Sequence, residues 1–356
     1  MLEDQSQNRH SDEPRLPQPH FQWRRHFFPM WVGQAFSLVG SRVVQFALVW
    51  WLTRETGSAT VLATATIVAL VPEIVLGPIA GAYVDRWQRK AVMLLADTTI
   101  ALASLLLAYL FWIGAVQVGH IYGLLFIRAL GGSFHWPAMQ SSTSLMVPER
   151  HLTRIAGANQ TLNGVLTIIS PPLGALLLEL IPMAAILLVD VGTAILAILP
   201  LLFVFVPQPI KKVAAAGAQS VWRDVRVGLA YVRGWPGLMA LIGVSLLIKL
   251  ALTPAFTLLP LLVSDYFRGS AADLAVLQAV SGIGMVAGGL LLSAWGGFKR
   301  RIYTAMGGVF VLGLGLLLVG LAPADEFFMA VIGGLVIGLT IPLIDGPIIA
   351  ILQSTV

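Results

Sequence analysis

Cysteine is absent from this chain of 356 residues, and charged residues are scarce. Without cysteine there is no disulfide bond, no thiol nucleophile and no thiolate metal site. Charged residues make up 11% of the sequence, against about 25% in an ordinary soluble domain, whereas hydrophobic residues make up 57%. A composition so poor in charge and so rich in apolar residues predicts a chain that lies mostly in a lipid bilayer.

The motifs of common catalytic sites are also missing. The sequence contains no HExxH, no GxSxG, no GxxxxGK[ST] and no cluster of residues with metal-ligand spacing. Its positive charges lie in short loops between apolar segments and form no basic face interleaved with aromatic residues. We therefore expect neither an enzyme nor a nucleic-acid-binding protein, and we expect no metal and no cofactor.

Long apolar segments account for most of the chain. A helix needs about 20 apolar residues to span a hydrocarbon core about 30 Å thick. This criterion predicts an all-α polytopic membrane protein with about ten transmembrane helices. The predicted spans are 27–52, 60–84, 91–115, 118–146, 157–180, 182–206, 238–263, 273–296, 302–322 and 326–352.

Polar stretches divide these spans into units. Residues 1–26 contain several proline and glutamine residues and predict a disordered cytoplasmic tail. The basic segment 207–237 predicts a cytoplasmic linker on the anionic inner leaflet. Between and after them we expect a six-helix bundle over 27–206 and a partial four-helix bundle over 238–356.

Lysine and arginine are distributed unequally over the two sides of the predicted membrane. Of the 22 cationic residues, 17 fall in segments on the side of the N-terminus, and only Arg54 and Arg268 fall in loops on the other side. Cytoplasmic loops carry such an excess of positive charge. We therefore expect a multi-pass protein of the plasma (inner) membrane with a cytoplasmic N-terminus.

The two parts of the chain resemble each other when one is shifted by about 210 residues, as in transporters built from repeated halves. Lys90 then meets Arg300, and Pro137 meets Pro347. The second part stops at the counterpart of Met146, so counterparts of the fifth and sixth spans are missing. We expect a C-terminally truncated transporter or an incomplete reading frame, with a complete ten-helix protein as the alternative.

The loop Gly81-Ala-Tyr-Val-Asp85-Arg86-Trp-Gln-Arg89-Lys90 lies between the second and third spans. It resembles the signature loop at this place in the major facilitator superfamily of secondary transporters. The family's usual glycine before the last Arg-Lys pair is glutamine here.

Further segments extend this resemblance over residues 27–356. Arg128-Ala-Leu-Gly-Gly132 matches the family's Arg-xxx-Gly motif in the fourth helix. Ser170-Pro171-Pro172-Leu-Gly174-Ala175 is similar to the Gly-Pro-xx-Gly-Gly bend of exporters, with Ser170 and Ala175 in place of two glycines. The phrases around Trp50, Gly77 and Gly346 resemble the macrolide-efflux and enterobactin-exporter branch of drug:proton antiporters.

The resemblance implies the two-bundle major facilitator fold and a monomer that works by alternating access. It also implies proton-coupled efflux of an amphipathic small molecule such as a drug, a macrolide or a siderophore. The signature residues Gly81, Asp85, Arg86, Arg89 and Lys90 would then serve in gating. Asp85 is implied to meet the N-terminus of an eleventh helix, and the sequence ends before such a helix.

Several ionisable side chains lie inside the predicted spans, where an unpaired charge costs about 2.5–3.5 kcal/mol. Glu73 lies about 18 Å deeper than Asp85 along a helix, and Arg128 lies about 15 Å from the outer end of its span. A buried carboxylate beside an arginine can change protonation as water access changes. The proton-coupling candidates are Glu73, Asp97, Arg128 and Asp190, and fixed ion pairs between helices are the alternative.

Polar and aromatic residues of the spans could also line a substrate cavity near the midplane. Packing between helices is the alternative for the aromatic residues. The cavity candidates are Gln34, Arg42, Gln45, Phe134, His135, Trp136, Lys249 and Asp345.

Three functions remain open from the sequence. The first is a secondary exporter driven by proton entry. The second is an uptake symporter or facilitator of the same fold, and the third is a membrane fragment that transports nothing. The expected partners are a small-molecule substrate, protons as the coupling ion, and the lipid bilayer.

Overall fold

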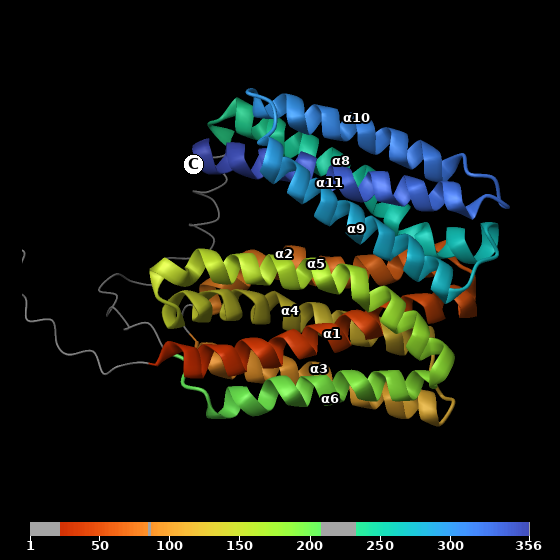
Figure 1. The fold of residues 1–356 in the computed structure, drawn as a ribbon. Coiled ribbons are helices and arrows are strands. Elements are labelled where there is room, and N and C mark those ends of the chain that lie inside the picture. Colours follow the sequence, from red (N-terminus) through yellow and green to blue (C-terminus); the bar gives the residue numbers. More distant parts are fainter. Residues whose placement is uncertain (1–21, 85–86, 208–232, 356) are drawn as a thin grey trace, which may run out of the picture.

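The computed structural model describes residues 22–84, 87–207 and 233–355, which are helical apart from short connections. Figure 1 shows the helices. They are α1 (Trp23–Thr56), α2 (Ala59–Val84), α3 (Arg89–Trp112), α4 (Val118–Met146), α5 (Glu149–Leu180), α6 (Met183–Phe203), α8 (Pro236–Leu261), α9 (Ala271–Trp295), α10 (Arg301–Gly320) and α11 (Phe327–Thr355), with a π-helical turn η1 (Leu262–Tyr266) after α8.

The helices confirm the all-α polytopic fold that the apolar segments predict. Nine of the described helices are long and apolar enough to cross a membrane. The remaining one, α4, coincides with the span predicted over 118–146 and carries more polar residues, including Arg128, His135 and the hydroxyl run Ser141–Ser144. It lies among the others, against α2 and α3 (Figure 1).

The first bundle consists of α1 to α6. In it, α4 packs against α2 and α3, α6 packs against α1 and α3, and α5 packs against α1. Successive helices run in opposite directions, so the start of α1, the end of α2, the start of α3 and the end of α6 lie together at one end (Figure 1). We call this end the signature-loop end. Two clusters of buried side chains fill the bundle, one around Leu48 and Leu187 and one around Met30 and Met93.

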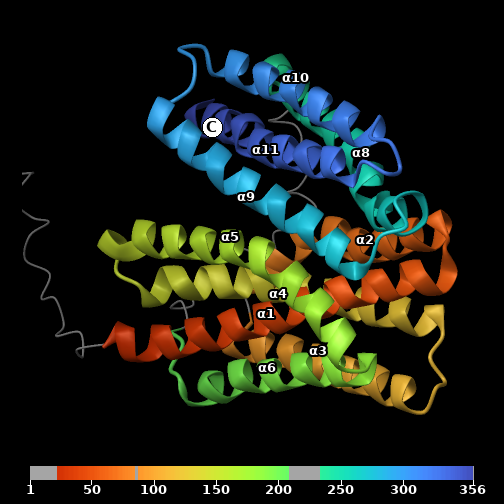
Figure 2. The ribbon, with the colours of Figure 1, turned by 45° about the vertical axis from the view of Figure 1, so that its right-hand side comes forward.

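The second group of helices repeats the arrangement of the first four. Both α9 and α10 pack against α11, as α2 and α3 pack against α4. The repeat that the sequence indicates is therefore also a repeat of packing. The two groups meet where buried residues of α1 and α5, such as Phe46 and Ala175, contact Val263 and Leu274 near η1. From there they diverge towards the signature-loop end, as Figures 1 and 2 both show.

The predicted tail and linker lie mainly outside the described residues. At the end of the tail, α1 begins at Trp23, four residues before the predicted start of the first span at residue 27. The ring of Trp23 packs against Phe27 and His151, with ring centroids 6.1 and 5.4 Å apart. These aromatic contacts give the first turn of α1 a surface to pack on.

The closest approach between helices of the second group occurs where α9 meets α11. A Cβ atom added to Gly284 or Gly288 would overlap the carbonyl oxygen of Leu335 or Leu339. Two glycines four residues apart thus let the two backbones touch, as small residues do in membrane helix pairs. The sequence offers the same spacing at Gly77 and Gly81, but an added Cβ there has no neighbour within 4 Å.

We predict that Gly288→Ala lowers the free energy of unfolding by about 1–3 kcal/mol, since the methyl group forces the α9 and α11 backbones apart. Gly289→Ala is the matched control, because an added Cβ at Gly289 meets nothing within 4 Å. Chemical unfolding of both variants in detergent micelles measures the difference. Equal stability of the two variants would contradict the close packing of α9 on α11.

Candidate functional site

An ion pair buried in the first bundle joins two of the predicted proton-coupling residues. Arg128 lies on α4 and Asp190 lies on α6, and Arg128 Nη1 is 2.6 Å from Asp190 Oδ2. The exposed fraction of the side chain is 12% for Arg128 and 2% for Asp190. Since a charge inside a membrane is stable only with a partner or with water, each residue satisfies the other.

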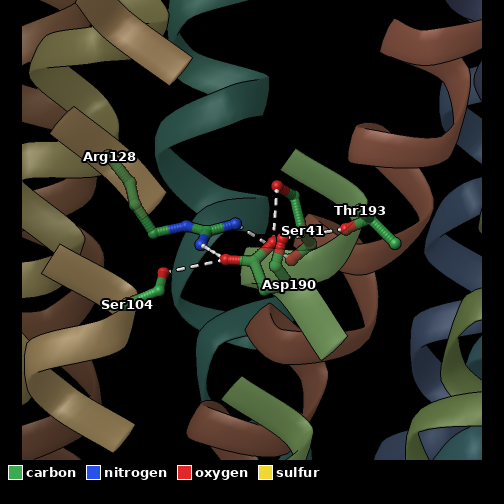
Figure 3. Close-up of polar contacts among 5 residues, drawn as sticks. All are labelled: Ser41, Ser104, Arg128, Asp190 and Thr193. Atoms are coloured by element: carbon green, nitrogen blue, oxygen red, sulfur yellow. Dashed lines mark hydrogen bonds and ion pairs between the residues drawn. The ribbon is translucent and has the colours of Figure 1, made fainter. Parts of the chain in front are cut away.

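Two further helices complete the surroundings of Asp190 (Figure 3). Ser104 of α3 donates to Asp190 Oδ2 at 2.8 Å, and Ser41 of α1 donates to Oδ1 at 3.2 Å. The backbone carbonyl of Ser41 accepts a hydrogen bond from Arg128 Nη2 at 3.2 Å. Thr193 donates its hydroxyl to the backbone carbonyl of Asp190. The pair therefore connects α1, α3, α4 and α6, and both charges have several hydrogen-bond partners.

Glycines on α1 make this arrangement possible. A Cβ added to Gly40 would overlap Thr193 Oγ1 and would lie 3.3 Å from Asp190 Cα. One added to Gly33 would lie 2.7 Å from the carbonyl oxygen of Leu196. Because α6 touches the backbone of α1 at both places, Ser41 is close enough to reach the carboxylate of Asp190.

A second buried polar cluster contains Asp97, a third proton-coupling candidate. Gln34 of α1 donates from Nε2 to Asp97 Oδ2 at 2.8 Å. His135 of α4 approaches with Nε2 at 3.3 Å from Asp97 Oδ1, but the buried Nε2 has no hydrogen bond of acceptable geometry. The structure thus brings together Asp97 and two residues that the sequence suggests for a substrate cavity.

A small cavity of about 70 Å³ adjoins this cluster. Its polar lining comes from α1, α4 and α5, and Trp31 Nε1 donates to Asn159 Oδ1 at 2.6 Å across it. By volume it has room for only a few water molecules. Its lining includes Trp31, Gln34, His135, Trp136, Gln140, Asn159 and Asn163.

A larger cavity of about 360 Å³ lies between the two groups of helices. Arg42 and Gln45 of α1 line it, as predicted for a cavity site, and both are exposed there. No carboxylate of the described residues pairs with Arg42 within 4 Å. The lining combines amide and hydroxyl groups with apolar side chains, including Thr167, Ser170, Phe256, Gln278, Ser281 and Met285.

Lys249 and Asp345 face a different cavity, of about 210 Å³, between α8 and α11. Both side chains are exposed, and no ion pair within 4 Å joins them in the described part of the chain. Thr253 and Phe256 also line this cavity, and Phe256 lines the larger cavity as well. The two spaces are therefore neighbours that share one aromatic side chain.

Two candidates lie apart from these clusters. Glu73 is an exposed residue of α2, and the described residues offer it no hydrogen bond or ion pair. Phe134 turns to another groove, between α3 and α4, where its ring stacks on Trp87 with centroids 6.1 Å apart. Trp136, two residues after Phe134, lies instead at the small cavity, together with the other cavity candidates Gln34 and His135.

Two cations of the signature loop, Arg89 and Lys90, bind backbone carbonyl groups of neighbouring helices. Lys90 Nζ donates to the carbonyl oxygens of Leu202 and Val204 at 2.7 and 3.0 Å, at the C-terminal end of α6, where a helix favours positive charge. Arg89 is buried and donates from Nη1 to the carbonyl of Ser141 in α4. Asp85 and Arg86 lie outside the described residues.

Some residues of these clusters are missing from the predicted set. Ser41, Ser104 and Thr193 surround Asp190, and Asn159 and Asn163 line the small cavity. Serine and threonine are common in transmembrane helices, so their presence alone singles out none of them. Ser41 lies next to Arg42, and Ser104 lies seven residues after Asp97 on the same helix. These positions relative to charged residues are the signal that could have identified the two serines.

The fold and the buried charges together define a polytopic membrane transporter built from two repeated groups of helices. The family model of the Major Facilitator Superfamily matches residues 30–356. The chain belongs to this superfamily, and among its members it is similar to macrolide efflux proteins.

Two relatives named Macrolide efflux protein A support this assignment. The protein of Streptococcus pyogenes is 35% identical over 334 residues, which cover 94% of this chain and 82% of that protein. The protein of Enterococcus faecalis is 34% identical over 300 residues, which cover 84% of this chain and 92% of that protein.

Solved structures show the same fold at low sequence identity. A bacterial homologue of the human lysosomal transporter Spinster, in an inward-facing and unoccupied conformation, has a TM-score of 0.66 at 13% identity and covers 93% of this chain and 79% of its own. The D-xylose-proton symporter also has a TM-score of 0.66 at 13% identity, covering 93% of this chain and 83% of its own.

We predict that Arg128→Met destabilises the protein by about 3–5 kcal/mol at neutral pH, because it leaves the carboxylate of Asp190 buried without a partner. Adding Asp190→Leu should recover most of this loss, since the pair is then removed as a whole. Chemical unfolding in detergent measures both variants. The control is Arg42→Met, which removes an exposed arginine of the neighbouring cavity and should change stability little. A double variant no more stable than Arg128→Met would contradict the pairing.

Proposed function

We propose that this chain is a secondary exporter that moves amphipathic small molecules of the macrolide class outward by alternating access in exchange for protons. The Arg128–Asp190 pair is the observation that carries this proposal. Its carboxylate is almost fully buried, and it lies about 10 Å along α6 from that helix's start. Transporters of this kind bind substrate and coupling ions near the middle of the membrane.

Protonation of Asp190 offers a physical route from proton to substrate. It removes the negative charge that holds Arg128, and it weakens the hydrogen bond from Ser41 to the carboxylate. Ser41 precedes Arg42 on α1, and Arg42 and Gln45 line the cavity between the two groups of helices. A change at the ion pair is therefore transmitted to the cavity wall within one turn of α1.

The larger cavity suits an amphipathic ligand. It presents amide and hydroxyl groups together with apolar surface, the combination that orients a ligand while burying most of it. The relatives with the name Macrolide efflux protein A support a macrolide as the substrate. The neighbouring cavity adds Lys249 and Asp345, whose charges could contribute to the recognition of polar groups.

The diverging signature-loop end supports an inward-open state. We propose that this end is cytoplasmic, together with the tail over 1–26 and the linker over 207–237, in the plasma (inner) membrane. The units 27–206 and 238–356 would then rock against each other, in a monomer. The signature loop, with Gly81, Asp85, Arg86, Arg89 and Lys90, is proposed to control closure at this end.

We predict that inside-out vesicles containing the protein accumulate radiolabelled erythromycin, a macrolide, when their lumen is acidic. A protonophore should abolish this accumulation. Asp190→Asn should reduce it at least tenfold, because the amide that replaces the carboxylate cannot take up and release a proton. Glu179→Gln is the control, since Glu179 is an exposed carboxylate at the end of α5, a helix that contributes no residue to the pair or its hydrogen bonds.

Two results would contradict the proposed function. Accumulation that is unchanged by the protonophore would rule out proton coupling. Movement of erythromycin only out of the acidic lumen would indicate an uptake symporter. Asp190→Asn must be checked for normal amounts in the membrane, so that a loss of transport is not a loss of protein.

A further inference from the structure

Three helices of the first bundle each carry two polar residues that are seven positions apart. Seven residues make nearly two turns, so both side chains of a pair leave the helix on almost the same face, about 10 Å apart along the axis. The pairs are Gln34 and Ser41 on α1, Asp97 and Ser104 on α3, and Arg128 and His135 on α4.

One member of each pair belongs to the Arg128–Asp190 cluster, which we call the first polar layer. The other members, Gln34, Asp97 and His135, form a second polar layer, two turns nearer to the signature-loop end. The carboxylate comes from α6 in the first layer and from α3 in the second. Both layers therefore contain residues of α1, α3 and α4, but the carboxylate comes from a different helix in each.

Apolar packing separates the two layers. Between them, a Cβ added to Gly131 of α4 would lie 2.9 Å from Ile100 of α3, and Ala96 lies beside them. Within the described part of the chain, no hydrogen bond between side chains links Asp97 or His135 with Arg128 or Asp190. No direct hydrogen-bonded path among these side chains therefore carries a proton from one layer to the other.

The second layer differs from the first in the chemistry of its base. An arginine keeps its charge at all physiological pH values, whereas a histidine gains or loses its charge in this range. His135 Nε2 is buried, lies 3.3 Å from Asp97 Oδ1 and has no hydrogen bond. Nε2 faces this carboxylate oxygen, so a proton on Nε2 could be donated to it in a hydrogen bond.

Few other titratable groups of the described chain face this cluster. Along α4 the nearest is Arg128, and along α3 the nearest are Lys90 and Arg89, each about two turns away. On α6, which packs against α3, the one titratable residue is Asp190, in the first layer. On α1 the facing residue is Gln34, which carries no charge.

On α5 the polar residues at the adjoining cavity are Asn159 and Asn163, which are also uncharged. On α2, which packs against α4, the ionisable residues are Glu73 and Tyr83, and both are exposed.

We propose that Asp97 and His135 form a second proton-binding site, which exchanges protons with the water of the signature-loop side through the small polar cavity. In the loaded state the proton resides on Nε2 and the imidazolium faces the Asp97 carboxylate. On release the proton passes to water in the cavity, leaving neutral His135 and an ionised Asp97 that still accepts from Gln34. The role in transport rests on the proposed proton-coupled export.

Gln34 and His135 belong both to this site and to the lining of the cavity. Loading the site ties α4 to α3 by an ion pair, and releasing the proton loosens that tie. The site therefore lets proton release on one side of the membrane change how α3 and α4 pack.

Transport by Asp97→Asn and His135→Gln tests the site, with His120→Gln as the control, since His120 is the other histidine of α4 and is exposed at its far end. In inside-out vesicles, exchange of radiolabelled erythromycin at equal pH should stay within about twofold of the unaltered protein. Accumulation driven by an acidic lumen should fall at least tenfold in both variants, and its dependence on the pH outside the vesicles should disappear. His120→Gln should behave as the unaltered protein does.

A second measurement does not depend on transport. The ring nitrogen signals of His135, recorded by NMR in lipid nanodiscs, should change between pH 5 and pH 8. Asp97→Asn should move the midpoint of this change, and Glu179→Gln should leave it in place.

The outcomes separate the two proposals. If the unaltered protein exchanges erythromycin but does not accumulate it in response to a pH gradient, the proposed function fails. The NMR titration alone then decides whether the proton site exists. Unchanged gradient-driven accumulation in both variants, or loss of equal-pH exchange as well, overturns the role of the site in coupling. A His135 signal that is constant from pH 5 to pH 8 overturns the site itself.

Discussion

The cost of a charge in a hydrocarbon environment is the constraint on which the first bundle depends. The carboxyl group of Asp190 is accommodated inside the helices because Arg128 and two serine hydroxyls donate hydrogen bonds to its oxygens. Those partners come from three other helices, so satisfying a single carboxylate fixes the relative positions of α1, α3, α4 and α6. The backbone contact of α6 with Gly33 and Gly40 belongs to the same arrangement, because a bulkier α1 would hold Ser41 out of reach. Packing and electrostatics are therefore two aspects of a single geometry.

This geometry also places the ion pair close to the cavity between the two groups of helices. Ser41 is bound to the pair, and the following residue, Arg42, faces the cavity between the two groups of helices. A helix is stiff over one turn, so a shift of Ser41 moves Arg42 with it. Elsewhere the two groups are held by apolar contacts near η1 and by the close packing of α5 on α9. Such contacts are suited to a pivot, because they leave the signature-loop ends free to separate or close.

The sequence predicted the fold better than it predicted the site. Ten spans could be located because each needs about 20 apolar residues, a property of the segment alone. The choice of neighbours is a property of the assembled bundle, and periodicity within one helix does not reveal it. Arg128, Asp190 and Asp97 were therefore identified as candidates without their partners. His135 was assigned to a cavity, and it lines the small cavity, but its contact with Asp97 was not predicted. Glu73 was chosen by its depth along α2, but depth does not tell which way a side chain faces, and it is exposed and apart from both layers.

The seven-residue spacing gives the two polar layers a common mechanical behaviour. A straight helix drifts by only about 20° over seven residues, so both residues of a pair move in the same direction when the helix rotates. A rotation of α4 that withdraws Arg128 from Asp190 therefore also withdraws His135 from Asp97. The apolar packing around Gly131 prevents a proton from passing directly between the layers, but it transmits this movement, since α3 and α4 are in contact there. The two proposed proton sites, about 10 Å apart, would in this way be coupled by the rigidity of α4 while each exchanges its proton separately.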